Sequence, residues 1–234
     1  GIGYEIGMEL YRNRGTVILI GRDKKKIDKI NKKFKNDKLV SFQCDVTKEV
    51  EVKDLFKKIN KRFKTIYGLV NCAGINPSRT NIINTKLLDW ELTIQTNLTS
   101  YFILCKQAIK LMKKSKRGAI VNISSVAADG MKDRIPYSSS KAGVIGLTKS
   151  LALDHAHENI RVNCICPAYI PTKLVQGFIN SLSKKEYNKL ISRHPMKRLG
   201  KPKDVATATK FLLSDDSNWI TGNILYVDGG YNIY

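Results

Sequence analysis

Residues 119–154 read AIVNISSVAADGMKDRIPYSSSKAGVIGLTKSLALD, and this stretch decides the fold. It opens with an apolar, β-rich run, Ala119–Ile123, that ends in the hydroxyls of Ser124 and Ser125. After a loop, apolar residues recur at helical spacing from Tyr137 to Asp154. A buried strand, a loop and an amphipathic helix together form one unit of an alternating α/β fold.

The same alternation continues along the whole chain. Runs rich in Val and Ile, of the kind covered on both faces of a sheet, are predicted as strands at Thr16–Ile20, Leu39–Cys44, Gly68–Cys72, Ala119–Ile123, Ile160–Ile165 and Asn223–Val227. Helical patterns lie between them, including one long helix from about Asp89 to Met112. We therefore predict an α/β fold: a Rossmann-type, doubly wound parallel sheet of about seven strands, helices on both faces, and a single domain over residues 1–234.

The beginning of the sequence suggests that one strand is missing. Gly1-Ile2-Gly3 runs directly into a helical pattern from Tyr4 to Arg14, whereas a glycine-rich opening of this kind follows a strand. We expect roughly a dozen upstream residues, which would hold the first strand and the first glycine of a phosphate-binding loop. Without a central strand, unpaired backbone edges would lie inside the fold.

Composition narrows the class of protein. The chain has 234 residues, enough for one α/β domain, and 42% hydrophobic residues, as in ordinary soluble proteins. It shows no membrane-length apolar run, no cleavable signal pattern and no metal-ligand cluster. The five cysteines include no CxxC pair and indicate reduced thiols, hence a cytoplasmic protein, or an organellar one if a targeting segment was removed. Cys164 and Cys166 are expected to point to opposite faces of their strand.

The net charge of +21 favours contact with polyanions in general. One interpretation is a surface for nucleic acid or for an acidic partner. The other is a set of lysines on solvated helix faces. Because the lysines alternate with apolar helix positions and form no tract interleaved with aromatic residues, we favour the second interpretation.

The sharpest chemical signal is Tyr137-Ser-Ser-Ser-Lys141. Four residues apart on a helix, the two side chains share one face, and an ammonium near a phenol lowers the phenol's pKa. Such a tyrosine can give a proton to a carbonyl oxygen or take one from an alcohol. The spacing alone is common on protein surfaces, but Ser125 ends a buried-type strand, and ligands bind at the carboxyl ends of parallel strands.

In this context the chain resembles the short-chain dehydrogenase/reductase family over essentially its whole length. The matching motifs follow the family's order: Gly1-Ile2-Gly3, Asp45-Val46, Asn71-Cys72-Ala73-Gly74, Asn97, the set Ser125, Tyr137 and Lys141, Cys166–Thr172, Arg198–Gly200, Ile220–Gly222 and Asp228–Gly230. One such motif is weakly specific, whereas the ordered series is very specific.

The resemblance implies an NAD(P)(H)-dependent oxidoreductase that moves a hydride between the nicotinamide and a carbonyl or secondary alcohol. The implied catalytic residues are Tyr137 as general acid/base, Lys141 to lower its pKa and hold the ribose, Ser125 to position the substrate oxygen, and Asn97 to hold a relay water. A helix-kink hydrogen bond is the other interpretation of Asn97. The implied cofactor-binding residues are Gly1, Ile2, Gly3, Arg22, Asp45, Val46, Asn71, Cys72, Ala73, Gly74, Tyr137, Lys141, Ile170 and Thr172.

The sequence departs from the family pattern at three places, of which the loop 126–136 bears on the substrate. Cys72 replaces the second asparagine of the family's N-N-A-G turn, and Ala168 replaces the glycine of its P-G loop. The loop 126–136 lacks the G-Q-x-N-Y ending common in 3-oxoacyl reductases and looks about one residue shorter. We therefore leave both a 3-oxoacyl thioester and a sugar, polyol or other alcohol open as the substrate.

The junction between the predicted strand Thr16–Ile20 and the helix after it bears on which dinucleotide the protein uses. Enzymes that use NAD usually place an acidic residue there to bind the ribose hydroxyls. Arg22 takes that place here, and a guanidinium suits a 2′-phosphate, so we predict a preference for NADP. Asp23, one position later, leaves NAD possible.

Residues 171–195 are expected to form a variable substrate lid, with a capping box at Ser183–Glu186. The family resemblance implies a homotetramer or homodimer that acts on a small-molecule carbonyl or alcohol, with no membrane partner. The rival class is a binding protein that would use this fold and the basic surface to hold nucleic acid.

Overall fold

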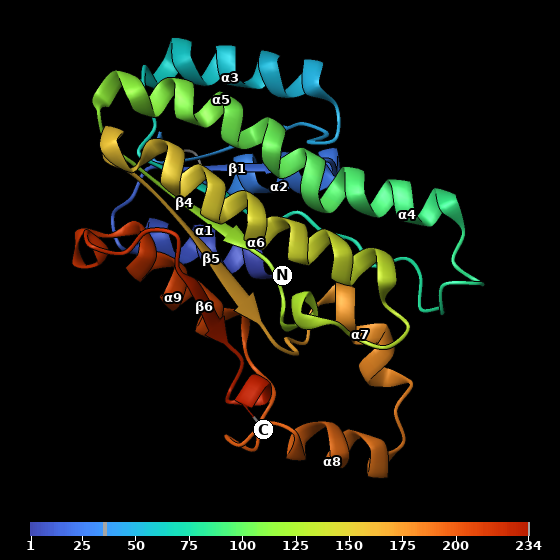
Figure 1. Ribbon diagram of the computed structural model, residues 1–234. Helices are drawn as coiled ribbons and strands as arrows, with labels where there is room; N and C mark the ends of the chain where they lie inside the picture. Colours follow the sequence, from blue (N-terminus) through green and yellow to red (C-terminus); the bar gives the residue numbers. More distant parts are fainter. Residues whose placement is uncertain (35–36, 234) are drawn as a thin grey trace.

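The computed structural model describes residues 1–34 and 37–233. Strands and helices alternate along this part of the chain (Figure 1). The strands are β1 (Val17–Gly21), β2 (Leu39–Gln43), β3 (Gly68–Asn71), β4 (Gly118–Ile123), β5 (Ile160–Pro167) and β6 (Ile224–Val227). The α-helices are α1 (Ile2–Arg12), α2 (Lys24–Lys33), α3 (Glu49–Phe63), α4 (Leu87–Ile94), α5 (Ser100–Ser115), α6 (Ile135–His155), α7 (Lys173–Asn180), α8 (Lys184–Ser192) and α9 (Pro202–Leu213).

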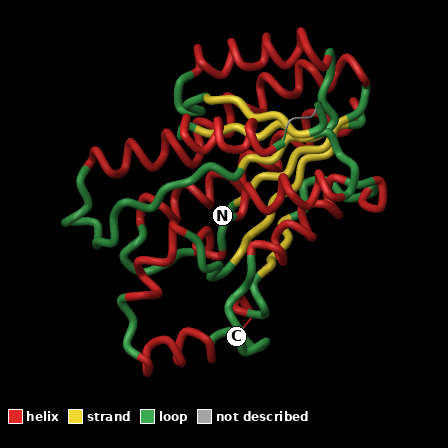
Figure 2. Tube along the Cα trace, turned by 180° about the vertical axis from the view of Figure 1, so that it is seen from behind, coloured by secondary structure: helices red, strands yellow, loops and turns green. Residues whose placement is uncertain are grey.

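All strand pairs are parallel, and helices cover both faces of the strands, which confirms the predicted doubly wound α/β architecture (Figures 1 and 2). The strand order is β1-β2 in one sheet and β3-β4-β5-β6 in the other. Helices α3, α5 and α6 lie on one face, and α1 and α9 lie together on the opposite face (Figure 1). The carboxyl ends of the strands therefore meet at one edge.

Burial explains why these segments fold as predicted. Every residue of β4 and β5 is buried, as expected for strands covered on both faces. On α3, the buried residues Val52, Leu55, Phe56 and Ile59 form one apolar stripe that belongs to the largest core cluster. The capping box predicted at Ser183 and Glu186 is present and begins α8.

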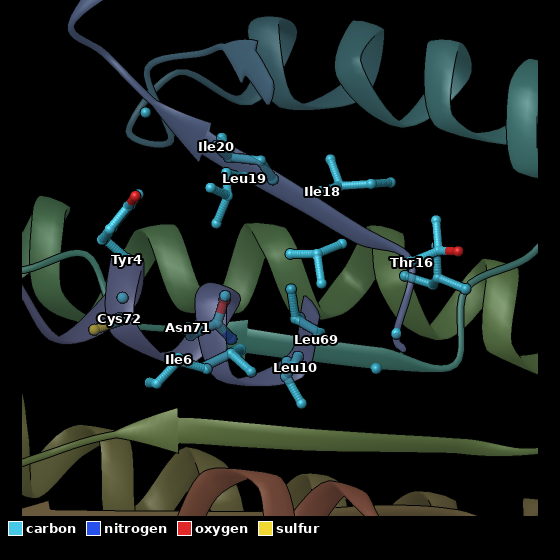
Figure 3. A pocket seen from close by; sticks show the side chains of 18 of the residues that line it. Tyr4, Ile6, Leu10, Thr16, Ile18, Leu19, Ile20, Leu69, Asn71 and Cys72 are labelled. Carbon is cyan, nitrogen blue, oxygen red and sulfur yellow. The ribbon is translucent and has the colours of Figure 1, made fainter. Parts of the chain in front are cut away.

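An apolar cavity of about 1750 Å³ separates the two sheets. Ile18, Leu19 and Ile20 of β1 line one side, Leu69 of β3 lines the other, and α1 contributes Ile6 and Leu10 (Figure 3). The six strands predicted between residues 16 and 227 all form in the described residues, and β1 and β3 do not pair with each other across this space.

Two expectations were wrong in detail. The single helix predicted from about Asp89 to Met112 is interrupted by a π-helical turn at Gln95–Thr99, with α4 before it and α5 after it. Cys164 and Cys166 lie in the same buried cluster rather than on opposite faces. Residues two apart in a strand share a face, so the correction follows from strand geometry.

Gly118, the first residue of β4, allows α5 to fold back closely onto the sheet. A Cβ atom at this position would lie 2.6 Å from Sδ, 2.8 Å from Cγ and 3.0 Å from Cβ of Met112. Because Met112 is fully buried, it has little room to move aside. We expect Gly118→Ala to lower the free energy of unfolding by about 1–3 kcal/mol in urea denaturation.

Gly146→Ala is the matched control, because a Cβ atom on this α6 glycine would meet nothing within 4 Å. Alanine favours a helix over glycine by roughly 0.5–1 kcal/mol, so this variant should be neutral or stabilising. Equal losses of stability in the two variants would contradict the packing argument.

Candidate active site

The structure brings together the four residues predicted to be catalytic, at the carboxyl edge of the larger sheet. Ser125 follows the end of β4, Tyr137 and Lys141 lie on the first turns of α6, and Asn97 lies in the π-helical turn before α5. A strand end and two helices thus converge at the position where parallel sheets bind ligands.

Lys141 places a cation inside this group. Its residue is 3% exposed, and its Nζ donates a hydrogen bond to the Ile123 carbonyl oxygen at 2.9 Å. The same Nζ lies 5.8 Å from the centroid of the Tyr137 ring. Loss of water around the ammonium lowers the pKa of Lys141 to about 8. The side chain is therefore still mostly charged at neutral pH and becomes neutral as the pH rises past this value.

Tyr137 is half-buried, and its pKa is raised to about 12. Loss of water is the largest cause, while a hydrogen bond with Ser125 lowers the pKa by less. The expectation that Lys141 leaves the phenol with a lowered pKa is wrong for this structure. The Lys141 ammonium donates to Ile123 rather than to the phenol, so burial decides the sign. The phenol accordingly keeps its proton at neutral pH.

Asn97 fixes the loop that follows β3. Its Nδ2 donates to the Ile75 carbonyl oxygen at 2.9 Å and to Ser140 Oγ at 3.1 Å, and its Oδ1 accepts the Ile75 N–H at 2.8 Å. The side chain is fully buried, so these bonds take the place of water. A Cβ atom on Gly74 would lie 3.6 Å from both Asn97 Oδ1 and Lys141 Nζ, so the Gly74 backbone packs next to these two groups.

Sequence reasoning did not find the residues that hold this arrangement in place. The hydroxyl of the fully buried Tyr101 donates to the carbonyl oxygens of Ala73, at 3.0 Å, and Ile123, at 3.2 Å. Ser124 Oγ donates to the Lys141 carbonyl oxygen at 2.8 Å. The sequence marks Ser124 only as one of two strand-end hydroxyls. The one sequence signal for Tyr101 is its position one turn after Asn97.

Some of the residues predicted to bind a dinucleotide line the cavity: Gly1, Gly3, Arg22, Val46, Asn71, Cys72 and Ala73. Gly1 is the N-cap of α1, Ile2 and Gly3 are its first residues, and a Cβ atom on Gly3 would lie 3.5 Å from Cys72. Gly7 packs α1 against β1, since a Cβ atom there would lie 2.4 Å from Leu19 Cδ2. Small residues at the start of α1 therefore keep its first N–H groups open toward the space in front of β3.

The end of β1 carries an exposed cation. Arg22 follows the strand with its side chain exposed, and its carbonyl oxygen accepts a hydrogen bond from Gln43 Nε2 at 3.1 Å. Asp23 is already engaged, because its Oδ1 accepts the Lys26 N–H at 3.1 Å and Oδ2 pairs with Lys26 Nζ at 2.6 Å. Asp23 thus begins α2 as its N-cap.

The remaining predicted residues divide into two groups. Asp45 and Val46 follow β2, and Asp45 Oδ1 accepts hydrogen bonds from the Thr47 backbone and hydroxyl at 3.1 and 2.7 Å. The others are less available to a ligand. Asn71 is 1% exposed and donates hydrogen bonds to Asn122 Oδ1 and Cys105 Sγ, and the Ala73 carbonyl oxygen accepts one from Tyr101. Ile170 is 2% exposed, and Thr172 directly precedes α7.

These residues fit a bound dinucleotide. The start of α1, Gly74 and the ammonium of Lys141 lie along one edge, and Arg22 lies at the end of β1 on the same edge. Lys141 makes one hydrogen bond in the described structure, so its ammonium has further donors for a ligand hydroxyl. Within residues 1–34 and 37–233, no group of His, Cys, Asp or Glu side chains is arranged to hold a metal ion.

The predicted lid, residues 171–195, contains α7 and α8. His194, at its end, is 1% exposed and packs against the rings of Tyr169 and Tyr231. Its Nδ1 lies 2.9 Å from the Leu190 carbonyl oxygen.

Among the helices that the structure describes, none has the length and apolar character needed to span a bilayer.

Comparison with known proteins gives consistent matches along the chain. The family model described as enoyl-(acyl carrier protein) reductase matches residues 1–232. The 3-oxoacyl-[acyl-carrier-protein] reductase of Buchnera aphidicola is 39% identical over 98% of this chain and 92% of its own length. The structure titled "ElxO with NADP Bound" is 37% identical with a TM-score of 0.92, over 100% of this chain and 95% of the other. The ligand-free aldohexose dehydrogenase of Thermoplasma acidophilum is 38% identical with a TM-score of 0.88, over 100% and 91% of the two chains.

Proposed function

The chain belongs to the short-chain dehydrogenase/reductase family, and on that premise we propose that it is a carbonyl reductase in which Tyr137 acts as the general acid. It is an NADP(H)-dependent oxidoreductase that transfers a hydride between the nicotinamide and a carbonyl or secondary alcohol. The observation that carries the proposal is a phenol that keeps its proton, beside a buried ammonium and the Ser125 hydroxyl.

Each residue has one role in this proposal. When bound, the nicotinamide supplies the hydride. Tyr137 gives its phenolic proton to the substrate oxygen, and Ser125 holds that oxygen next to the phenol by a hydrogen bond. Lys141 binds the ribose hydroxyls and stabilises the phenolate left after proton transfer. Asn97 positions the loop at Ile75 and, through Ser140, the first turn of α6.

The substrate class is the less specific part of the proposal. Curated relatives such as the Buchnera protein are named as 3-oxoacyl-[acyl-carrier-protein] reductases, which supports a 3-oxoacyl thioester as the first class to test. The aldohexose dehydrogenase, of nearly equal identity, supports a sugar as the alternative. A panel of both, assayed with NADPH and NADH, separates the two classes.

We also propose how the chain is organised and where it works. Leu88, Leu92, Phe102 and Leu153, on α4, α5 and α6, are 46–81% exposed and offer apolar surface for a homodimer or homotetramer. Residues 171–195 serve as the substrate lid. The free thiols support a cytoplasmic location.

Tyr137→Phe should abolish ketone-dependent NADPH oxidation, with a loss of roughly 10²–10⁴-fold, because the proton donor is removed. Binding of NADPH, followed by its fluorescence, should change little. A tyrosine-to-phenylalanine variant of ElxO has a solved structure with NADPH bound. This supports the expectation that such a change leaves binding of the cofactor intact. A variant that keeps its activity would remove Tyr137 from the mechanism.

If instead the basic surface serves nucleic acid, DNA binding would survive this change and weaken steeply with salt.

The pH profile tests Lys141. Its ammonium is charged below its pKa of about 8 and neutral above it, so kcat/KM for NADPH should fall as the pH rises through this region. In Lys141→Arg, the guanidinium stays charged, so the descending limb should move upward or disappear even if the rate is lower. A limb at the same pH in both proteins would assign it to another group.

Arg22→Gln tests the cofactor preference. Loss of a charge-assisted contact to the 2′-phosphate costs about 1.5–3 kcal/mol, so KM for NADPH should rise about 10- to 100-fold while KM for NADH changes little. Lys24→Gln, in the exposed first turn of α2, removes the same charge and serves as the control. Equal weakening of both cofactors in Arg22→Gln would contradict a phosphate contact.

A further inference from the structure

Two arginines, Arg134 and Arg79, form no ion pair with an acidic side chain in the described part of the chain. Arg134 directly precedes α6, one turn before Tyr137, and its Nη1 donates only to the Asp133 carbonyl oxygen, at 3.0 Å. Arg79 lies in the segment between β3 and α4, and its guanidinium stacks 4.0 Å from the centroid of the Phe178 ring. Other basic residues of this chain, such as Arg198 with Asp204, do form ion pairs.

Tyr169 connects the segments that carry the two arginines. Its hydroxyl lies 3.8 Å from the sulfur of Met131, in the loop that leads to Arg134. Its ring lies 5.9 Å from the ring of Phe178 on α7, the residue on which Arg79 stacks. Phe178 on α7 thus links Arg79 to Tyr169, and the loop at Met131 links Tyr169 to the segment that carries Arg134.

The positive charges of Arg79 and Arg134 repel each other in this structure. Loss of water lowers the pKa of both guanidinium groups, and the charge of Arg79 lowers the pKa of Arg134 further. Tyr169, the adjacent Asp133 carboxylate and Tyr137 act on the pKa of Arg134 in the opposite direction, so the guanidinium interacts with the proposed acid. Like charges that are partly removed from water gain most from an anion placed between them.

A carboxylate matches these groups in shape as well as in charge. The planar guanidinium presents parallel N–H donors that bind a carboxylate in a bidentate manner. Arg134 precedes Tyr137 by three residues, which is slightly less than one helical turn of about 5.4 Å. An anion held at Arg134 would therefore lie only a few bonds from a carbonyl oxygen held at Tyr137.

We propose that Arg134, together with Arg79, selects carbonyl substrates that carry a carboxylate within a few bonds of the reacting carbon. This inference rests on the proposed carbonyl reduction and names the class of substrate for it. Arg134 stands at a position in the Ser-to-Tyr loop where the sequence departs from the ending common in 3-oxoacyl reductases. In this proposal, the changed ending of the loop serves to bind the carboxylate of the substrate.

The test compares two ketones that differ in charge but share a carbon skeleton, 3-oxobutanoate and methyl 3-oxobutanoate. With the full chain and saturating NADPH, kcat/KM for the acid should exceed that for the ester by at least about tenfold, the value of one charged hydrogen bond. Arg134→Gln should remove this preference through a higher KM for the acid, with a much smaller change in kcat/KM for the ester. Arg79→Gln should reduce the preference by less, because Arg79 is the more exposed of the two.

Lys132→Gln is the matched control, because Lys132 is an exposed cation in the same loop. It should leave the preference for the acid intact. If the wild-type protein reduces the ester as well as the acid, or if Arg134→Gln loses both activities equally, the inference is overturned. Equal effects of Lys132→Gln and Arg134→Gln would also overturn it, since they would reflect general surface charge.

A binding measurement separates this inference from the proposed reaction. Calorimetric titration of the NADP-saturated protein with 3-hydroxybutanoate and its methyl ester reports recognition without turnover. Tighter binding of the acid, lost in Arg134→Gln, supports the inference even if no ketone is reduced, in which case the proposed reaction fails alone. Reduction of ketones without any preference for the acid in binding or rate leaves the reaction standing and rejects the arginine site.

Discussion

The hydrogen bond from the Lys141 ammonium to the Ile123 carbonyl oxygen is the constraint on which the site depends. A buried cation is costly unless it is hydrogen-bonded, so its position is defined by the few oxygens within reach. Ile123 ends β4, and its carbonyl also accepts the Tyr101 hydroxyl from α5. One carbonyl thereby fixes a strand end, a helix and the charged side chain together. The ring of Tyr137 lies beside this framework, with its centroid 5.8 Å from Lys141 Nζ.

Buried polar contacts extend this framework into the core. Asn71 of β3 donates to Asn122 of β4 at 2.8 Å, and Asn122 donates to Thr148 of α6 at 3.0 Å. Such contacts have little freedom of register, because a shift by one residue would leave buried amides without partners. Strands β3 and β4 and the helix α6 are thus aligned by polar groups, while the surrounding apolar clusters supply most of the stability.

The strands were predictable because their apolar runs are continuous, and the bounds of β3, β4 and β6 differ from the predicted ones by a single residue at most. The set Ser125, Tyr137 and Lys141 was predictable because a strand end and one helix face bring the three residues together. The π-helical turn was not, since it depends on Asn97 bonding to Ile75 across a loop. The sign of the Tyr137 pKa shift was missed for a similar reason: helix spacing places the two side chains on one face but does not say where the ammonium donates its hydrogen bond. The convergence of Arg79 and Arg134 likewise depends on how the lid packs against Tyr169.

The N-cap at Asp23 has a consequence for how this protein can diverge. The carboxylate that would suit an unphosphorylated ribose also starts α2, so one side chain cannot be redirected to a ligand without loosening the first turn of the helix. A change at Arg22 meets no such restriction, because that side chain is exposed and the backbone carbonyl supplies its contact with Gln43. Evolution toward the other dinucleotide therefore has an easy route at position 22 and a structurally disruptive one at position 23. Descendants of this chain should accumulate exchanges at the former and retain the aspartate at the latter.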